Sequence, residues 1–230
     1  MIKHGKTNLR SYMIMDYSFD GVCIEDGVLF PNSWKFSVDL TATARGNADA
    51  EQIEQASKAA TDAYLKIRYW LDTNLRGIVL SLVGNHNDFE MAMHVENPVM
   101  YVPGTLSDDV ISQLLHAKIS ALAGTSLIVG TLRIASVQSA LRYAFDPVDT
   151  GYNLPDTTEY FTYGKVLHDV PWWFRDDGFC VELPVPQDGS EHQYVDPMDK
   201  FLAPMESDTE EQPSTPGRVT RIDSWTPKKV

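Results

Sequence analysis

The sequence is poor in cysteine, and its two cysteines, Cys23 and Cys180, lie far apart along the chain. No pair of cysteines, or of cysteine and histidine, has the spacing of a structural zinc site. We therefore expect reduced thiols, as is usual in the cytosol. The N-terminus has no signal-peptide pattern, and no run of 18 apolar residues could cross a membrane. These absences predict a protein made in the cytoplasm, with no cofactor, no bound metal and no membrane anchor.

Positive charge is also scarce, because 19 lysines and arginines stand against 32 aspartates and glutamates, a formal net charge of −13. Nucleic acids and anionic membranes are bound by clustered basic side chains. The sequence shows no basic stripe, so we expect neither a nucleic acid nor a membrane as partner. The charge balance suits a protein that stays dispersed or that binds other proteins.

Sequence motifs for catalysis are missing as well. The glycines match neither the phosphate-binding loop GxxxxGK[ST] nor the dinucleotide fingerprint GxGxxG, and no GxSxG nucleophile turn occurs. No nucleophile stands beside a base in a recognisable pattern. The sequence therefore gives no positive indication of an enzyme.

The regular part of the chain begins with strands. Residues 11–43 are rich in aromatic and branched side chains, Asp26 and Gly27 form a turn signal, and residues 34–44 alternate between apolar and polar. Residues 50–75 carry an apolar stripe at steps of three and four, which predicts a helix. Asp49 and Gln52 match a capping box at its start, and Gly77 follows its end.

A strand over residues 77–83, a polar turn and a return strand over residues 89–95 are predicted next. A second helix follows Ser107, with His116 on its solvated side, and a strand covers residues 125–137. The order predicts an α+β, ferredoxin-like βαββαβ fold, with two helices on one face of an antiparallel sheet. Extra N-terminal strands and a long irregular C-terminal extension complete it.

The composition of the chain changes near residue 145, after which turn-forming and aromatic residues are frequent and no helical stripe occurs. We divide it into an α+β domain over residues 1–145 and an aromatic-rich irregular segment over 146–202, packed on the domain or on a partner. The third part is an extended proline-rich arm over 203–230, in which an acidic stretch precedes a basic end. Trp225 near the end of the arm is a candidate interface anchor.

The stretch GNHNDFEMAMH, residues 84–94, supplies the candidate metal ligands His86, Asp88 and His94. Imidazole and carboxylate groups are suitable ligands for zinc, iron or manganese. The spacing matches no known metal signature, however, and glycine, asparagine and aspartate are common in turns for conformational reasons alone. The favoured interpretation is a polar turn that leads into a strand.

The richest chemical neighbourhood is KVLHDVPWWFRDDGF, residues 165–179. His168, Asp169 and Asp176 could bind a cation or share a proton. Aromatic residues and arginine are enriched where protein surfaces meet, so the favoured hypothesis makes this stretch an anchor for a long loop, on the domain or on a partner. The anchor residues are Trp172, Trp173, Phe174 and Arg175.

These observations favour a non-catalytic assembly subunit that forms a homo-oligomer and contacts neighbouring subunits through its C-terminal arm. Compact domains with extended arms occur in virus particles and in phage tails or necks, and this architectural analogy extends the expected location to a virus particle. The alternative is a metal-dependent enzyme or small-molecule binder. Its site would use His86, Asp88 and His94, or His168, Asp169 and Asp176.

Overall fold

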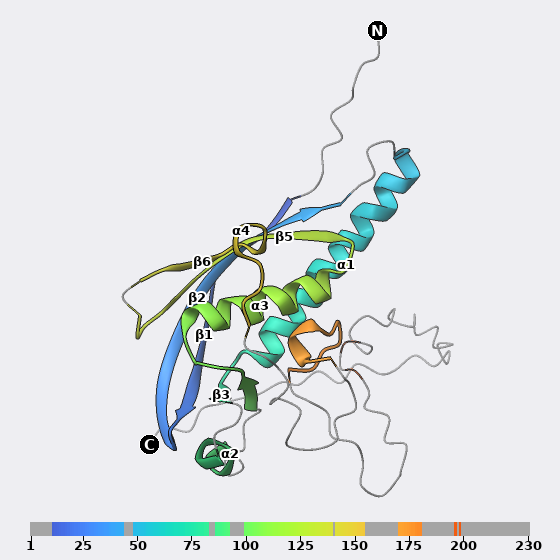
Figure 1. The fold of residues 1–230 in the computed structure, drawn as a ribbon. Coiled ribbons are helices and arrows are strands. Elements are labelled where there is room, and N and C mark those ends of the chain that lie inside the picture. Colours follow the sequence, from blue (N-terminus) through green and yellow to red (C-terminus); the bar gives the residue numbers. More distant parts are fainter. Residues whose placement is uncertain are drawn as a thin grey trace, which may run out of the picture.

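The computed structural model confirms an α+β fold, in which the helices α1 and α3 lie on one face of a six-stranded mixed sheet (Figure 1). The structure describes residues 11–43, 48–82, 86–92, 99–139, 141–154 and 170–180, together with residues 196 and 198. The arm over 203–230 and most of the segment over 181–202 lie outside these residues.

The centre of the sheet is a long hairpin of β1 (Ser11–Glu25) and β2 (Val28–Ala42). The turn falls at Asp26 and Gly27, as the sequence predicts, and both residues have positive φ angles, of 51° and 73°. This conformation suits the right-handed twist of paired strands. The hairpin is extended by β5 (Leu127–Ser136) beside β2 and by β6 (Tyr143–Phe145) beside β5, both antiparallel.

The other edge of the sheet differs from the prediction. Beside β1 lie β3 (Ile78–Leu82) and then β4 (Val99–Val102), and both pairings are parallel. The expected antiparallel arrangement is therefore wrong at this edge. Parallel neighbours need a crossover connection rather than a tight turn. Part of that connection is the helix α2 (His86–Ala92), which stands where the sequence predicted a turn and the start of a return strand.

The first long helix, α1 (Ala50–Asn74), forms where its stripe predicts it. The backbone N–H of Gln52 donates to the Asp49 carboxylate, and the Gln52 side chain accepts from the Asp49 N–H, which completes the expected capping box. Gly77 follows the helix with a φ of 65°, as expected for a residue that reverses the chain.

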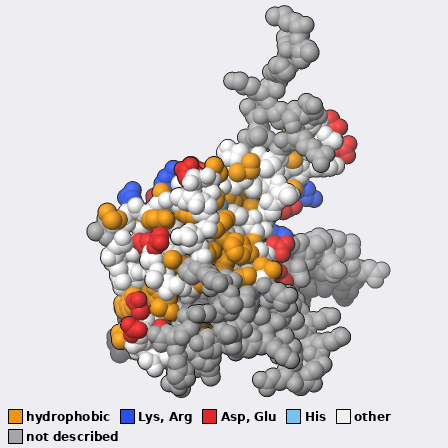
Figure 2. Space-filling model, in the orientation of Figure 1, with side chains coloured by type: hydrophobic (Ala, Val, Ile, Leu, Met, Phe, Trp, Pro, Cys, Tyr) orange, Lys and Arg blue, Asp and Glu red, His pale blue; other side chains and the backbone are white. Residues whose placement is uncertain are grey.

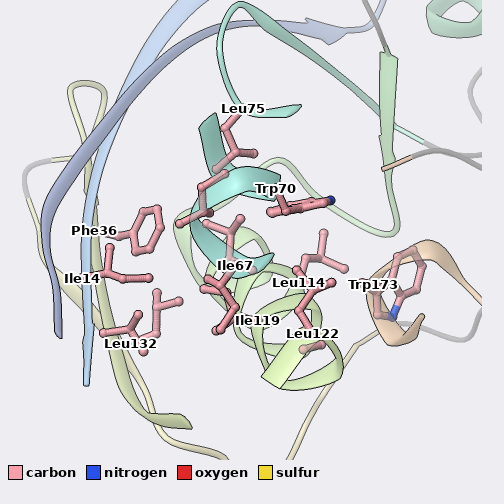
Figure 3. Packing of buried hydrophobic residues seen from close by; sticks show 14 of the residues in the cluster. Ile14, Phe36, Ile67, Trp70, Leu75, Leu114, Ile119, Leu122, Leu132 and Trp173 are labelled. Atoms are coloured by element: carbon pink, nitrogen blue, oxygen red, sulfur yellow. The ribbon is translucent and has the colours of Figure 1, made fainter. Parts of the chain in front are cut away.

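The second long helix, α3 (Asp108–Ala123), is buried on nearly every side. Figure 3 shows Ile14 and Phe36 of the sheet pointing toward Ile67 of α1 and Ile119 of α3, while Trp173 lies on the opposite side of α3. Two short elements follow the sheet along the chain, α4 (Pro147–Thr150) and the 3₁₀ turn η1 (Trp172–Phe174). The helix α3 is thus the middle layer between the sheet and η1.

Candidate functional site

The segment over residues 170–180, which we call the anchor segment, packs against α3 with its tryptophans inward. Trp172 and Trp173 are fully buried, and their rings meet edge to face with centroids 5.6 Å apart. Trp172 also stacks on Trp70 of α1, and its indole N–H donates to the Tyr101 carbonyl at 3.3 Å. Both tryptophans therefore fasten the segment to the core of their own chain.

A buried lysine of α3 holds the same segment by its polar backbone. The Lys118 ammonium is fully buried and donates to the carbonyls of Trp172, Arg175 and Asp177 at 3.1, 2.8 and 2.8 Å. It also lies 3.4 Å from the Asp177 carboxylate. Desolvation lowers the pKa of Lys118 to about 8, although the charge of Asp177 opposes this shift. Lys118 thus satisfies backbone carbonyls of a segment whose only regular element among the described residues is the short turn η1.

Asp177 organises the polar side of the anchor segment. Its carboxylate accepts from the Arg175 guanidinium at 2.7 Å and from the Phe179 N–H at 3.1 Å. Asp176, which the sequence suggested as a cation ligand, is exposed. Asp177, and not Asp176, is therefore the aspartate that stabilises the anchor segment.

Phe174 is the one member of the tryptophan–phenylalanine run that faces outward, with 46% of its surface exposed. Its ring meets that of Tyr152 edge to face at 5.9 Å and contacts the buried Trp173 at 6.1 Å. Hydrophobic side chains gather over α3 and η1 on the face in Figure 2. Phe174 and Tyr152, which we call the aromatic patch, form an exposed aromatic surface, and Phe174 packs on the buried ring of Trp173.

His116 is buried, so the predicted solvated position on α3 is wrong. Its Nδ1 lies 2.7 Å from the Tyr152 hydroxyl, and its Nε2 lies 3.2 Å from the Gly130 carbonyl. Burial lowers the pKa of His116, against the opposing effects of the Gly130 carbonyl and the Asp146 charge. Sequence periodicity failed here because α3 is covered on both sides, whereas the prediction assumed one solvated face.

The candidate metal ligands are not brought together in the described residues. Asp88 is buried in α2, and its carboxylate accepts from the Gly27 N–H at 2.7 Å. This bond ties α2 to the turn between β1 and β2. His86 begins α2, and His94 lies outside the described residues. Within the described ranges, no group of three histidine, cysteine or acidic side chains could hold a metal ion.

Three further candidates, His168, Asp169 and Trp225, lie outside the described residues. Among the residues that are described, the sequence pattern predicted no role for Lys118 and a solvated position for the buried His116. The sequence signal for Lys118 is a lysine within a strongly apolar helix. Lysine is rarely buried without partners, so such a lysine indicates a buried hydrogen-bonding site. Its partners come from the anchor segment, more than fifty residues later in the chain.

Comparison with known proteins gives no family. No protein-family model matches the chain, and a search of curated proteins finds no match either. Among the described helices, none is both long enough and apolar enough to span a membrane. The contacts within this chain are therefore the basis for assigning its function.

Proposed function

We propose that this protein is a non-catalytic assembly subunit, which forms a homo-oligomer through the aromatic patch. The exposed ring of Phe174, held on buried Trp173, is the observation that carries the proposal. Binding energy between proteins is concentrated in a few aromatic or arginine side chains that are rigidly presented. An ordered aromatic ring loses little conformational entropy on binding.

The proposal includes the proline-rich arm over residues 203–230 as a second contact with neighbouring subunits. A compact domain with such an arm suits a repetitive particle, of the virus or phage tail and neck type, in which each subunit holds the next. This part of the proposal is supported by the composition of the arm and by architectural analogy.

The test is the substitution Phe174→Ser, followed by light scattering over a dilution series of the full chain. We expect the concentration at which the oligomer dissociates to rise about tenfold or more, the effect of losing an interface hot spot. The fold should be unchanged, because Phe174 is half exposed.

Leu141→Ser is the matched control, since Leu141 is an exposed apolar side chain, 77% accessible, beyond the end of β5. It should leave the dissociation midpoint within about twofold, as expected for surface substitutions. A wild-type monomer at every concentration would overturn the proposal, as would equal shifts in both variants. A mass or a stability that changes with EDTA would instead favour the metal-dependent alternative.

A further inference from the structure

The outer face of the sheet, opposite the helices, carries an unusual group of cations. On β2 and β5, Phe36 and Ile134 are paired and buried toward the helices. Side chains alternate along a strand, so their neighbours Lys35 and Arg133 point to the outer face. Arg142, just before β6, is exposed and lines the same cavity.

Small residues form the floor between these long side chains. Ala135 pairs with Lys35, Ser37 pairs with Arg133, and Arg133 also pairs with Ala144 of β6. The result is a cavity of about 210 Å³. We call this feature the cationic groove; its charged members are Lys35, Arg133, Arg142 and Asp16.

The cations of the groove are available for a new partner. Lys35 pairs with Asp16 at 3.3 Å and Arg133 with Asp39 at 3.6 Å, and all four side chains are about half exposed. Exposed ion pairs of this kind contribute little stability and can exchange partners. Arg142 makes no ion pair with any residue that the structure describes. The lining residues carry three positive charges against one negative, in a chain of net charge −13.

An irregularity in β1 shapes one wall of the groove. The register between β1 and β2 shifts between Ile14 and Tyr17, and Asp16 has a positive φ of 51°. The Asp16 N–H donates to the Ser37 hydroxyl at 3.0 Å, which fixes this bulge. Bulges often re-aim a side chain at a functional surface. Here the bulge places the Asp16 carboxylate beside Lys35.

We propose that the cationic groove binds the acidic stretch over residues 206–211 of a second copy of the chain. This stretch carries Glu206, Asp208, Glu210 and Glu211 within six residues. Carboxylates match the arginine guanidinium with paired, charge-assisted hydrogen bonds. The inference rests on the proposed function, because it assigns a receptor surface to the arm of the assembling subunit.

The experiment uses a fluorescent peptide of residues 204–213 and the full-length chain, in which E206Q, D208N, E210Q and E211Q remove the competing native stretch. Fluorescence anisotropy gives the dissociation constant. We expect R133Q/R142Q to weaken binding about tenfold or more, and high salt to weaken it further, because both remove attraction between exposed charges. A peptide with the same four neutral substitutions should not bind.

K58Q/R76Q is the matched control, because it also removes two exposed cations, but from α1 and the residues just after it. It should change peptide affinity by less than twofold. Equal weakening by both variants would mean non-specific attraction and would overturn the inference. Absence of peptide binding would overturn it as well.

Two readouts separate this inference from the proposed function. If the wild-type protein is an oligomer and R133Q/R142Q does not affect peptide binding, the groove assignment fails while the assembly proposal stands. If the wild-type protein is a monomer in light scattering, yet the chain with the neutralised stretch binds the peptide in the groove, docking between copies is overturned. An oligomer whose groove variant loses the peptide supports both.

Discussion

At the residue scale, the side chain of Lys118 connects two parts of the fold that are more than fifty residues apart in the sequence. Its ammonium joins α3 to three carbonyls of the anchor segment in a site without solvent access. A buried charge is costly unless its hydrogen bonds are satisfied, and here they are. Lys118 therefore helps to fix the position of the anchor segment on α3. Apolar packing is not directional, so it would fix that position less closely by itself.

Replacing Lys118 with methionine should lower the free energy of unfolding by about 2–4 kcal/mol, because several buried carbonyl oxygens lose their donor. The measurement is urea denaturation, with limited proteolysis to locate the loosened segment. Lys66→Met, on the partly exposed side of α1, is the control and should change stability by less than about 0.5 kcal/mol. An unchanged anchor segment in K118M would contradict this role.

The same lysine predicts a pH dependence. The pKa of Lys118 is about 8 in the folded protein and about 10.4 in an unfolded chain, so the unfolded state binds more protons between these values. Stability from this group therefore rises as pH increases through that window. The difference in unfolding free energy between wild type and K118M should grow by about 1 kcal/mol from about pH 7.5 to about pH 9. A constant difference would show that the lysine stays charged throughout.

The two tryptophans of the anchor segment offer an independent prediction. Trp172→Ala or Trp173→Ala should each cost about 3–5 kcal/mol, because a fully buried indole leaves a large cavity. Thermal unfolding measures this loss, and Phe174→Ala should cost far less, since its ring is half exposed. If all three variants were equally stable, the packing of the anchor segment described above would be wrong.

At the element scale, the elements predicted correctly are those with a local signal. The helix α1 has its own apolar stripe and capping box, and the hairpin has its Asp26–Gly27 turn. The helix α2 was predicted as a turn and strand because Phe89, Met91 and Met93 alternate in the sequence, although a seven-residue helix also fits this short stretch. Its position is set by Asp88, whose bond to Gly27 joins residues 61 apart in sequence.

The candidate site was predictable only in part, for a similar reason. Aromatic composition marked the stretch 170–180, but the direction of each ring depends on α3 and α1, which are distant in sequence. No local pattern in the sequence predicts the cationic groove. Lys35, Arg133 and Arg142 become neighbours only when β2, β5 and β6 pair.

The two long helices begin differently, which gives a test at this scale. Asp49→Ala should lower stability by about 1 kcal/mol, because the capping box of α1 is lost. Ser107→Ala should have a smaller effect, since the Ser107 side chain makes no capping bond with α3. Chemical denaturation of both variants measures the difference, and an equal loss would indicate that the capping box adds no stability.

At the scale of the whole molecule, the core depends on residues far beyond the sheet. The anchor segment closes the outer side of α3, and Met198 is buried in the same hydrophobic cluster. The residues beyond 202 are outside the described part of the chain and belong to the proposed arm.

The buried core residues in the described part of the chain all lie at or before Met198, so deleting residues 203–230 should leave the α+β fold intact while it weakens assembly. We expect thermal unfolding to change by only a few degrees, and light scattering to show a smaller oligomer or a higher dissociation midpoint. Deleting residues 170–230 is the contrasting variant and should unfold the domain, because Trp172 and Trp173 are removed. Unchanged assembly after the shorter deletion would count against the arm.

The position of the anchor segment has a consequence for synthesis. A ribosome makes α3 some fifty residues before the tryptophans and carbonyls that cover its outer side. During that interval the residues of all six strands and of the helices α1 and α3 have been made, but Lys118 lacks its acceptors and the indole of Trp70 lacks its stacking partner. Nascent chains halted before residue 170 should recruit chaperones that bind exposed apolar surface, and those halted well beyond residue 198 should release them.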